Sequence, residues 1–145
     1  MKSSKLLFAS STLFYVFYDI FSTIAASEYL GTFDYEKSLV LKASYNAGGM
    51  AGFILIKLLF SLMALSLVYL LVERNHRFRG AGLGIMAGAT GAGLFVGTSN
   101  LNIVLNGSSF WIMGVDSGTI AAFIIILCTI GGFLLIPGDV PARAA

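Results

Sequence analysis

Four long apolar stretches dominate the sequence and limit what fold it can adopt. They cover residues 6–26, 49–72, 80–98 and 119–136. At roughly 1.5 Å per residue, about 20 apolar residues in a helix cross the 30 Å hydrocarbon core of a bilayer. A backbone surrounded by lipid must satisfy its own hydrogen bonds, so each stretch is predicted to be a helix. We therefore expect an all-α fold, an integral membrane four-helix bundle that forms one domain.

The composition agrees with a lipid environment. The chain is 57% hydrophobic and 11% charged, with a mean hydropathy of +0.89, whereas a soluble domain carries about 25% charged residues. The net charge is only +2, and the basic residues stand in short clusters beside apolar stretches. This pattern is typical of topology signals and argues against nucleic-acid binding. We expect a multi-pass protein of the cell membrane.

The first stretch has an alternative interpretation as a cleaved signal peptide. Two lysines precede it, and the small residues 25–27 resemble a cleavage site. However, the stretch is longer than the 7–15-residue apolar region of a signal peptide, and it contains Asp19. These features favour a retained membrane helix.

Lysine and arginine in the connecting segments predict the orientation. Six lie on one side of the predicted membrane, namely Lys2, Lys5, Arg74, Arg77, Arg79 and Arg143. The other side has only Lys37 and Lys42. Because cytoplasmic loops carry the excess of basic residues, both termini and the turn at residues 73–79 are predicted to be cytoplasmic.

Two longer segments are then expected on the outer side. Residues 27–48 mix charges with apolar side chains and predict a partly helical stretch in the outer interface. Residues 99–118 predict a surface hairpin with Trp111 at the headgroup level, in preference to a re-entrant loop. Pro137 is predicted to end the fourth helix.

One acidic and one basic residue lie inside the first two predicted helices. Asp19 is seven residues from the outer end of the first, and Lys57 is eight residues into the second. In antiparallel helices, both side chains reach a depth of about 10–12 Å. An isolated charge there costs roughly 2.5–3.5 kcal/mol. We therefore predict an Asp19–Lys57 ion pair that faces the interior of the bundle.

Polar and small residues at helical spacing accompany Asp19 on the first helix, namely Thr12, Tyr15, Ser22, Thr23 and Ala26. On the second helix, Ser61 lies one turn from Lys57. Three roles for these charges remain open. The pair fixes the register of two helices, or it relays an ion or proton or contacts a substrate, or Lys57 alone extends toward the headgroups.

The third predicted helix is rich in glycine. Two registers are apparent, one formed by Gly80, Gly84 and Gly88 and the other by Gly93 and Gly97. Small residues at this spacing allow helix backbones to approach closely. The registers point to different sides, so they predict packing within the chain, self-association, or both.

No constellation in the sequence predicts catalysis. One histidine, His76, excludes a multi-histidine metal or haem site within the chain. One cysteine, Cys128, excludes an intrachain disulfide. No nucleophile stands beside a base, and no metal-ligand spacing occurs. We expect a protein that is not an enzyme and has no metal or cofactor.

Residues 10–72 carry a further pattern. Asp19-Ile20-Phe21-Ser22-Thr23 precedes Glu36, and Lys57 follows. This region resembles a family of small archaeal and bacterial multi-span membrane proteins, a domain of unknown function with the pattern Asp-x-x-x-Thr, Glu-x-Asn-Pro and Lys. Here Lys37-Ser38-Leu39 replaces x-Asn-Pro. The resemblance implies that Glu36 joins Asp19 and Lys57 in one polar cluster.

Two functions are compatible with these residues. The first is a structural or accessory subunit, acting in a homo-oligomer or in a larger membrane complex, because catalytic groups are lacking and the glycines suit helix contacts. The alternative is a small oligomeric transporter or channel that uses the Asp19/Lys57 polar centre. A polar cavity that reaches Asp19 from outside would favour the alternative.

Overall fold

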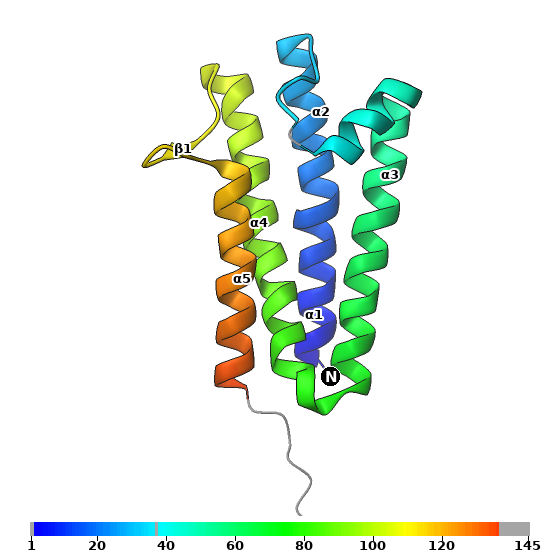
Figure 1. Cartoon of the computed structure of the whole chain (residues 1–145), viewed down its shortest axis with the longest axis vertical. Helices are drawn as coiled ribbons and strands as arrows, with labels where there is room; N and C mark the ends of the chain where they lie inside the picture. The colour runs from blue at the N-terminus through cyan, green and yellow to red at the C-terminus, as the bar shows by residue number, and fades with distance from the viewer. Residues whose placement is uncertain (1, 37, 137–145) are drawn as a thin grey trace, which may run out of the picture.

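The structure is a computed structural model that describes residues 2–36 and 38–136. The chain begins with one continuous helical rod (Figure 1), and a π-helical segment lies within it. Its parts are α1 (Lys2–Ser11), η1 (Thr12–Tyr18) and α2 (Asp19–Leu30). We call this rod the N-terminal helix. It ends where Gly31 adopts a left-handed conformation, with φ of 66°, which glycine accommodates without strain.

Three further long helices and one short hairpin follow. The elements are α3 (Leu39–Arg74), the 3₁₀ turn η2 (His76–Phe78), α4 (Arg79–Asn106), β1 (Trp111–Ile112), β2 (Val115–Asp116) and α5 (Ser117–Leu135). The strands are antiparallel, with Trp111 opposite Asp116. Met113 and Gly114 between them both have positive φ, as a type I′ hairpin turn requires.

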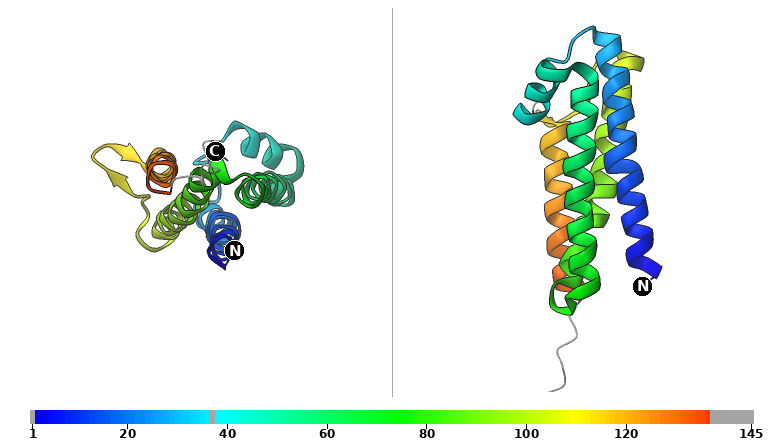
Figure 2. Two further views of the ribbon diagram at one scale, coloured as in Figure 1. Left: turned by 90° about the horizontal axis from the view of Figure 1, so that it is seen from below. Right: turned by 90° about the vertical axis from the view of Figure 1, so that its right-hand side faces the viewer.

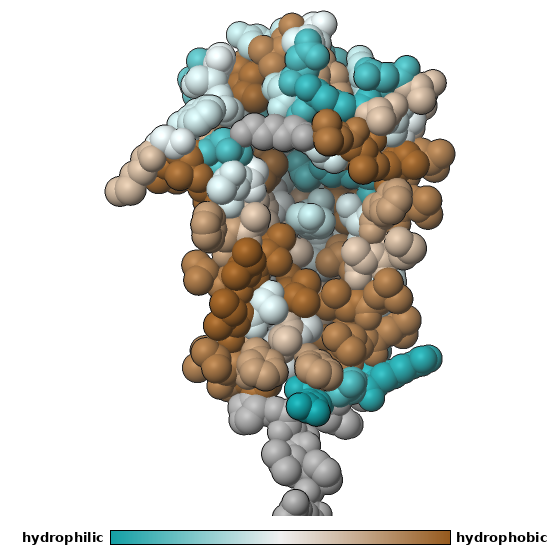
Figure 3. All heavy atoms as spheres, viewed as in Figure 1, coloured by the Kyte–Doolittle hydropathy of each residue, from teal (hydrophilic) through white to brown (hydrophobic). Residues whose placement is uncertain are grey.

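Four helices are long and apolar enough to cross a membrane: the N-terminal helix from Ser3, α3, α4 and α5. The predicted all-helical class is thereby confirmed. In the most apolar parts of α3 and α5, only 6% of residues are buried inside the structure. Figure 3 shows their apolar side chains as a brown band between more polar ends. A surface this apolar requires lipid or protein to cover it.

The helix limits differ from the predicted ones at the end that carries the two longer connections. The helix predicted to stop at residue 98 continues to Asn106, and the helix predicted to start at residue 49 is preceded by further helical turns from Leu39, which join it across a kink at Gly49. Polar residues alternate with apolar ones in these added turns, so no unbroken apolar stretch marked them as helix. Three residues used in the predictions, Lys37, Pro137 and Arg143, lie outside the described residues.

A kink at Gly49 turns the first part of α3 aside. Gly49 has φ of 61° and ψ of −153°, so two helices meet there at a non-helical residue. Ser38 caps the first of them, since its Oγ accepts a hydrogen bond from the Leu41 N–H. Leu39 and Val40 are exposed on this segment. The predicted partly helical stretch thus takes the form of a short helix set across the top of α3 (Figure 1).

Helix α4 lies at the centre of the arrangement. It packs against α5 on one side and against the N-terminal helix on the other, while α3 packs beside the N-terminal helix and α4. Seen along the helices in Figure 2, α3 and α5 lie on opposite flanks. They share no substantial contact within the described residues. The assembly of helices is therefore open on the side between α3 and α5.

Glycine permits the close approach of α4 to both neighbours. At Gly80 and Gly84 an added Cβ would overlap the backbone of α5, and at Gly88 it would come within 2.7 Å of Ile125 Cα. At Gly93 and Gly97 it would overlap the N-terminal helix. The two registers do point to different sides, but both partners belong to the same chain. None of these five glycines is left to contact a second copy.

The helices have two distinguishable ends. We call the end with residues 31–38 and 107–116 the loop end, and the opposite end, which holds Lys2, the 74–79 turn and Ile136, the terminal end (Figure 1). At the terminal end, Ser4 Oγ donates a hydrogen bond of 2.6 Å to Glu73 Oε1. This bond joins the start of the N-terminal helix to the end of α3.

Candidate polar ligand pocket

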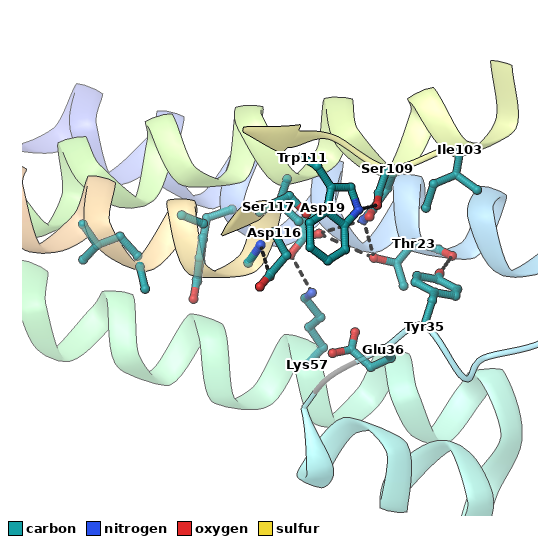
Figure 4. Close-up of a pocket in the computed structure, with 17 residues that line it drawn as sticks. Asp19, Thr23, Tyr35, Glu36, Lys57, Ile103, Ser109, Trp111, Asp116 and Ser117 are labelled. Carbon is teal, nitrogen blue, oxygen red and sulfur yellow. Dashed lines mark hydrogen bonds and ion pairs between the residues drawn. The ribbon is translucent and has the colours of Figure 1, made fainter. Parts of the chain in front are cut away.

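A pocket of about 360 Å³ lies near the loop end, on the open side between α3 and α5. In Figure 3, white and teal side chains occupy this hollow between brown flanks. All four long helices and both connections of the loop end contribute to it. Its lining comprises Tyr15, Asp19, Thr23, Tyr35, Glu36, Lys57, Val96, Asn100, Ile103, Ser109, Trp111, Asp116, Ser117, Gly118, Ala121, Ala122 and Ile125. Figure 4 shows these side chains.

Asp19 and Lys57 meet in the wall of the pocket. Lys57 Nζ lies 2.6 Å from Asp19 Oδ2, and their side chains are 11% and 10% exposed, respectively. The ammonium also lies 5.6 Å from the centroid of the Phe53 ring, a cation–π distance. The structure therefore brings together the two charges that the sequence places at one depth.

A π-helix lies immediately before Asp19. Over η1 the helix is wider than an α-helix, and the Asp19 N–H bonds to the carbonyl of Phe14, five residues earlier. Each such turn holds about one more residue than an α-helical turn, which rotates everything that follows. The direction in which Asp19 points thus depends on η1. Short π segments often occur at functional sites.

Asn100 completes the polar cluster, and sequence reasoning missed it. Its Nδ2 lies 3.1 Å from Thr23 Oγ1, 3.3 Å from Ser22 Oγ and 3.5 Å from Asp19 Oδ1. Because the third helix was predicted to end at residue 98, Asn100 was assigned to a loop. Its spacing from Gly93 and Gly97 would have placed it on the face that contacts the N-terminal helix.

Tyr35 and Thr23 link the loop to the N-terminal helix. Tyr35 Oη donates a hydrogen bond of 2.6 Å to the Thr23 carbonyl. Burial raises the pKa of the Tyr35 phenol well above its ordinary value, and the carboxylates of Glu36 and Asp19 add to this rise. The phenol therefore stays protonated at neutral pH and remains a donor. The sequence placed residues 27–48 in the outer interface and did not single out Tyr35.

Glu36 lines the same pocket from the loop. Its Oε1 accepts a hydrogen bond of 2.8 Å from the Ser38 N–H, which orients the side chain. In Figure 4 its carboxylate lies on the side of the pocket from which Lys57 projects. Among the described residues, Lys57 forms an ion pair with Asp19 and not with Glu36. Glu36 thus lines the same pocket as the ion pair, as the resemblance implied, but it forms no ion pair with Lys57 in the described structure.

The hairpin forms the mouth of the pocket. Trp111 Nε1 donates a hydrogen bond of 3.1 Å to Ser109 Oγ, and the indole is 63% exposed. Asp116 caps α5, because its Oδ1 accepts from the N–H groups of Gly118 and Thr119 at 3.0 and 3.1 Å. The residue predicted to mark the headgroup level, Trp111, therefore also borders the pocket.

The character of the lining changes with depth. Asp116, Ser117, Glu36 and Thr23 lie toward the loop end, whereas Tyr15, Val96, Ala122 and Ile125 lie further toward the terminal end of their helices. Asp19, Asn100 and Lys57 stand between the two groups. Along α5 the lining runs from Ser117 to Ile125, a depth of about 12 Å. The pocket thus has a mouth of mixed character, where Ile103 and Trp111 accompany the polar residues, a charged middle, and a floor that is apolar apart from the Tyr15 hydroxyl.

Two of the polar positions predicted on the first helix do not line the pocket, and neither does Ser61 on the second. Ser22 is fully buried, and its Oγ donates to the Asp19 carbonyl. Thr12 Oγ1 is buried and has no hydrogen-bond partner among the described residues. Within the same residues, no three His, Cys, Asp or Glu side chains gather closely enough to hold a metal ion.

Comparison of this chain with protein-family models, curated proteins and solved structures gives no match. The resemblance of residues 10–72 to a membrane protein family stays a prediction. Function is therefore inferred from the pocket and from the helices around it.

Proposed function

We propose that the protein crosses the cell membrane four times, with both ends in the cytoplasm, and binds a small polar ligand from the outer side. The ligand would occupy the pocket beside Asp19 and Lys57, in a subunit of a small oligomeric transporter. The observation that carries this proposal is the cavity of about 360 Å³ that reaches the buried ion pair. This volume lies at the lower end of the roughly 300–1,000 Å³ typical of ligand pockets.

The helix lengths support the proposed placement in a bilayer. Helix α5 has 19 residues, a length of about 28 Å, which matches the 30 Å hydrocarbon core. Its first residue, Ser117, then marks the outer boundary, and the pocket extends inward from there. The excess of lysine and arginine at the terminal end supports a cytoplasmic location for that end.

The charge pair supports ligand binding because it is not enclosed on all sides. A pair that serves only to lock two helices has no need of a cavity that reaches it. Here the pair forms part of a cavity wall, and the ammonium of Lys57 has three donors. Asp19 Oδ2 is the one hydrogen-bond acceptor for Lys57 within the described residues. Donors therefore remain for a ligand.

The π-helix supports a second state, which transport requires. If η1 changed to α-helical geometry, the residues after it would rotate by about 100°, the angle of one residue in an α-helix. Asp19 would then turn away from Lys57. An ion pair next to a helix with two packing geometries is a suitable switch between ligand-bound and ligand-free states.

A structural or accessory role in a larger assembly is the second proposal. It is favoured by the lack of substantial contact between α3 and α5 in the described part of the chain, which leaves the side of the molecule open to a helix from another subunit. Neither proposal involves catalysis. In both, lipid covers the exposed apolar faces of α3 and α5.

Thiol labelling tests the first proposal. In a Cys128→Ala background, Ala121→Cys places a thiol in the pocket, where Ala121 is 8% exposed. The matched control is Phe123→Cys, on the same helix but at a side chain that is 58% exposed and outside the pocket lining. A small, membrane-impermeant thiol reagent is added to intact cells.

We expect the thiol at position 121 to react at least tenfold faster than the thiol at position 123, because only the former faces water. Equal rates, or an unreactive position 121, would refute a pocket open to the outer side. Reaction only in inverted vesicles would refute the orientation.

A further inference from the structure

We propose that the ligand is a membrane phospholipid with a zwitterionic headgroup, which enters from the outer leaflet through the opening between α3 and α5. This inference rests on the proposed function and names the substrate class of the same pocket. It follows from three observations, namely the charges that face the pocket, the change of its lining with depth, and its position at the side of the molecule.

Lys57 and Glu36, which carry opposite charges, can each form a further hydrogen bond with a ligand in the pocket. Lys57 donates to Asp19 with one of its three N–H groups. Glu36 accepts from the Ser38 N–H at Oε1, and its Oε2 has no hydrogen-bond partner among the described residues. A phosphodiester would accept hydrogen bonds from Lys57, and an ammonium would donate to Glu36. A headgroup that carries both charges satisfies both side chains.

The change of lining with depth indicates an amphipathic ligand. A small soluble zwitterion would leave the floor at Val96, Ala122 and Ile125 without an apolar partner. A lipid would place its headgroup in the charged middle and the start of an acyl chain against this floor. Burial of apolar surface there contributes roughly 25 cal/mol per Å², which a ligand without a chain does not gain.

The opening lies where a lipid would meet it. Helices α3 and α5 do not close over the pocket, and exposed apolar side chains such as Leu55 and Phe123 lie on those helices. An acyl chain can therefore remain among the lipids while the headgroup occupies the pocket. Trp111 at the mouth is of the residue type enriched at the headgroup level of bilayers.

Intrinsic fluorescence provides a direct test, because Trp111 is the one tryptophan in the chain. The full-length protein in mild detergent is titrated with lysophosphatidylethanolamine, with glycerophosphoethanolamine, which has no chain, and with lysophosphatidylglycerol, which has no ammonium. We expect lysophosphatidylethanolamine to bind at least tenfold more tightly than either of the other probes.

A charge-neutral variant tests the role of Glu36. Glu36→Gln keeps an oxygen acceptor for the Ser38 N–H but removes the negative charge. We expect it to lower the affinity for lysophosphatidylethanolamine at least tenfold, whereas the affinity for lysophosphatidylglycerol, a net anion, should not fall. Glu28→Gln, at an exposed residue outside the pocket lining, is the matched control and should bind like the parent. Circular dichroism of each variant checks the fold.

The outcomes separate this inference from the proposed function. If glycerophosphoethanolamine binds as tightly as the lysolipid, the ligand is a soluble zwitterion, and the lipid inference is overturned while the pocket proposal stands. If no probe binds although position 121 is labelled from outside, the substrate class is wrong. If a helix of a second copy covers the opening, the protein should form a stable oligomer that binds no lipid. That result would also overturn the inference.

Discussion

Replacement of Lys57 by methionine should destabilise the protein, because methionine keeps most of the side-chain volume but removes the charge opposite Asp19. Asp19 Oδ1 would retain only two long hydrogen bonds, both of 3.5 Å, from Asn100 Nδ2 and Thr23 Oγ1. Removing one member of a buried ion pair costs about 3–5 kcal/mol. The pocket admits some water to this site, so we expect the lower end, about 3 kcal/mol of unfolding free energy.

The double variant Asp19→Asn with Lys57→Met isolates the interaction. Removal of both charges leaves no uncompensated carboxylate, and the new amide can still accept a hydrogen bond from Asn100. Replacing both partners is often close to neutral. We therefore expect the double variant to lie within about 1 kcal/mol of the parent. The single variant Asp19→Asn completes the cycle, and because it leaves Lys57 without its acceptor we expect it to be destabilising too, so that the coupling energy is about 2 kcal/mol or more.

Reversible unfolding in mixed detergent micelles, followed by far-UV circular dichroism, measures these free energies. Lys42→Met on the same helix is the matched control, since Lys42 forms no ion pair in the described structure. It should change stability by less than about 0.5 kcal/mol. If Lys57→Met were as mild as Lys42→Met, the Asp19–Lys57 pair would not stabilise the fold.

Two further predictions concern helix packing and the loop. Gly84→Ala should lower the midpoint of thermal unfolding strongly, because its Cβ would overlap the backbone of α5, whereas Gly131→Ala meets no atom within 4 Å and should be neutral or stabilising in the same assay. Tyr35 should titrate above its ordinary pKa of about 10, as followed by ultraviolet absorbance, because burial raises that pKa. The folded state then binds this proton more tightly than the unfolded state, so stability should fall as pH rises above about 10. A Tyr35 titration at the ordinary pKa would contradict its buried bond to the Thr23 carbonyl.

The sequence alone was sufficient for the features that depend on local periodicity. Apolar length predicted four helices long enough to span a membrane, because helix formation in lipid follows from backbone hydrogen bonding within each segment. Residue counting along antiparallel helices placed Asp19 and Lys57 at one depth, since the rise per residue is constant. Glycine spacing indicated close approach between helices. None of these inferences needs knowledge of which helix neighbours which.

The helix limits at the loop end were less predictable. Three asparagines interrupt the apolar residues between 99 and 106, so the apolar stretch ends at residue 98, yet α4 continues through these turns. Asn100 was missed for this reason. Its buried amide donates to the hydroxyls of Ser22 and Thr23 on the N-terminal helix. These residues lie 78 and 77 positions before Asn100 in the chain, so local periodicity cannot reveal the contact.

Only the tertiary structure decided that α4 is central, that both glycine registers are used within the chain, and that α3 and α5 stand apart. The pocket follows from this arrangement, because a cavity is the space that packed elements leave unfilled and no single segment encodes it. The same holds for Glu36 and Trp111, which reach the pocket from connections on opposite flanks. Their proximity to Lys57 depends on how whole helices pack, a sum of many weak contacts between residues distant in sequence.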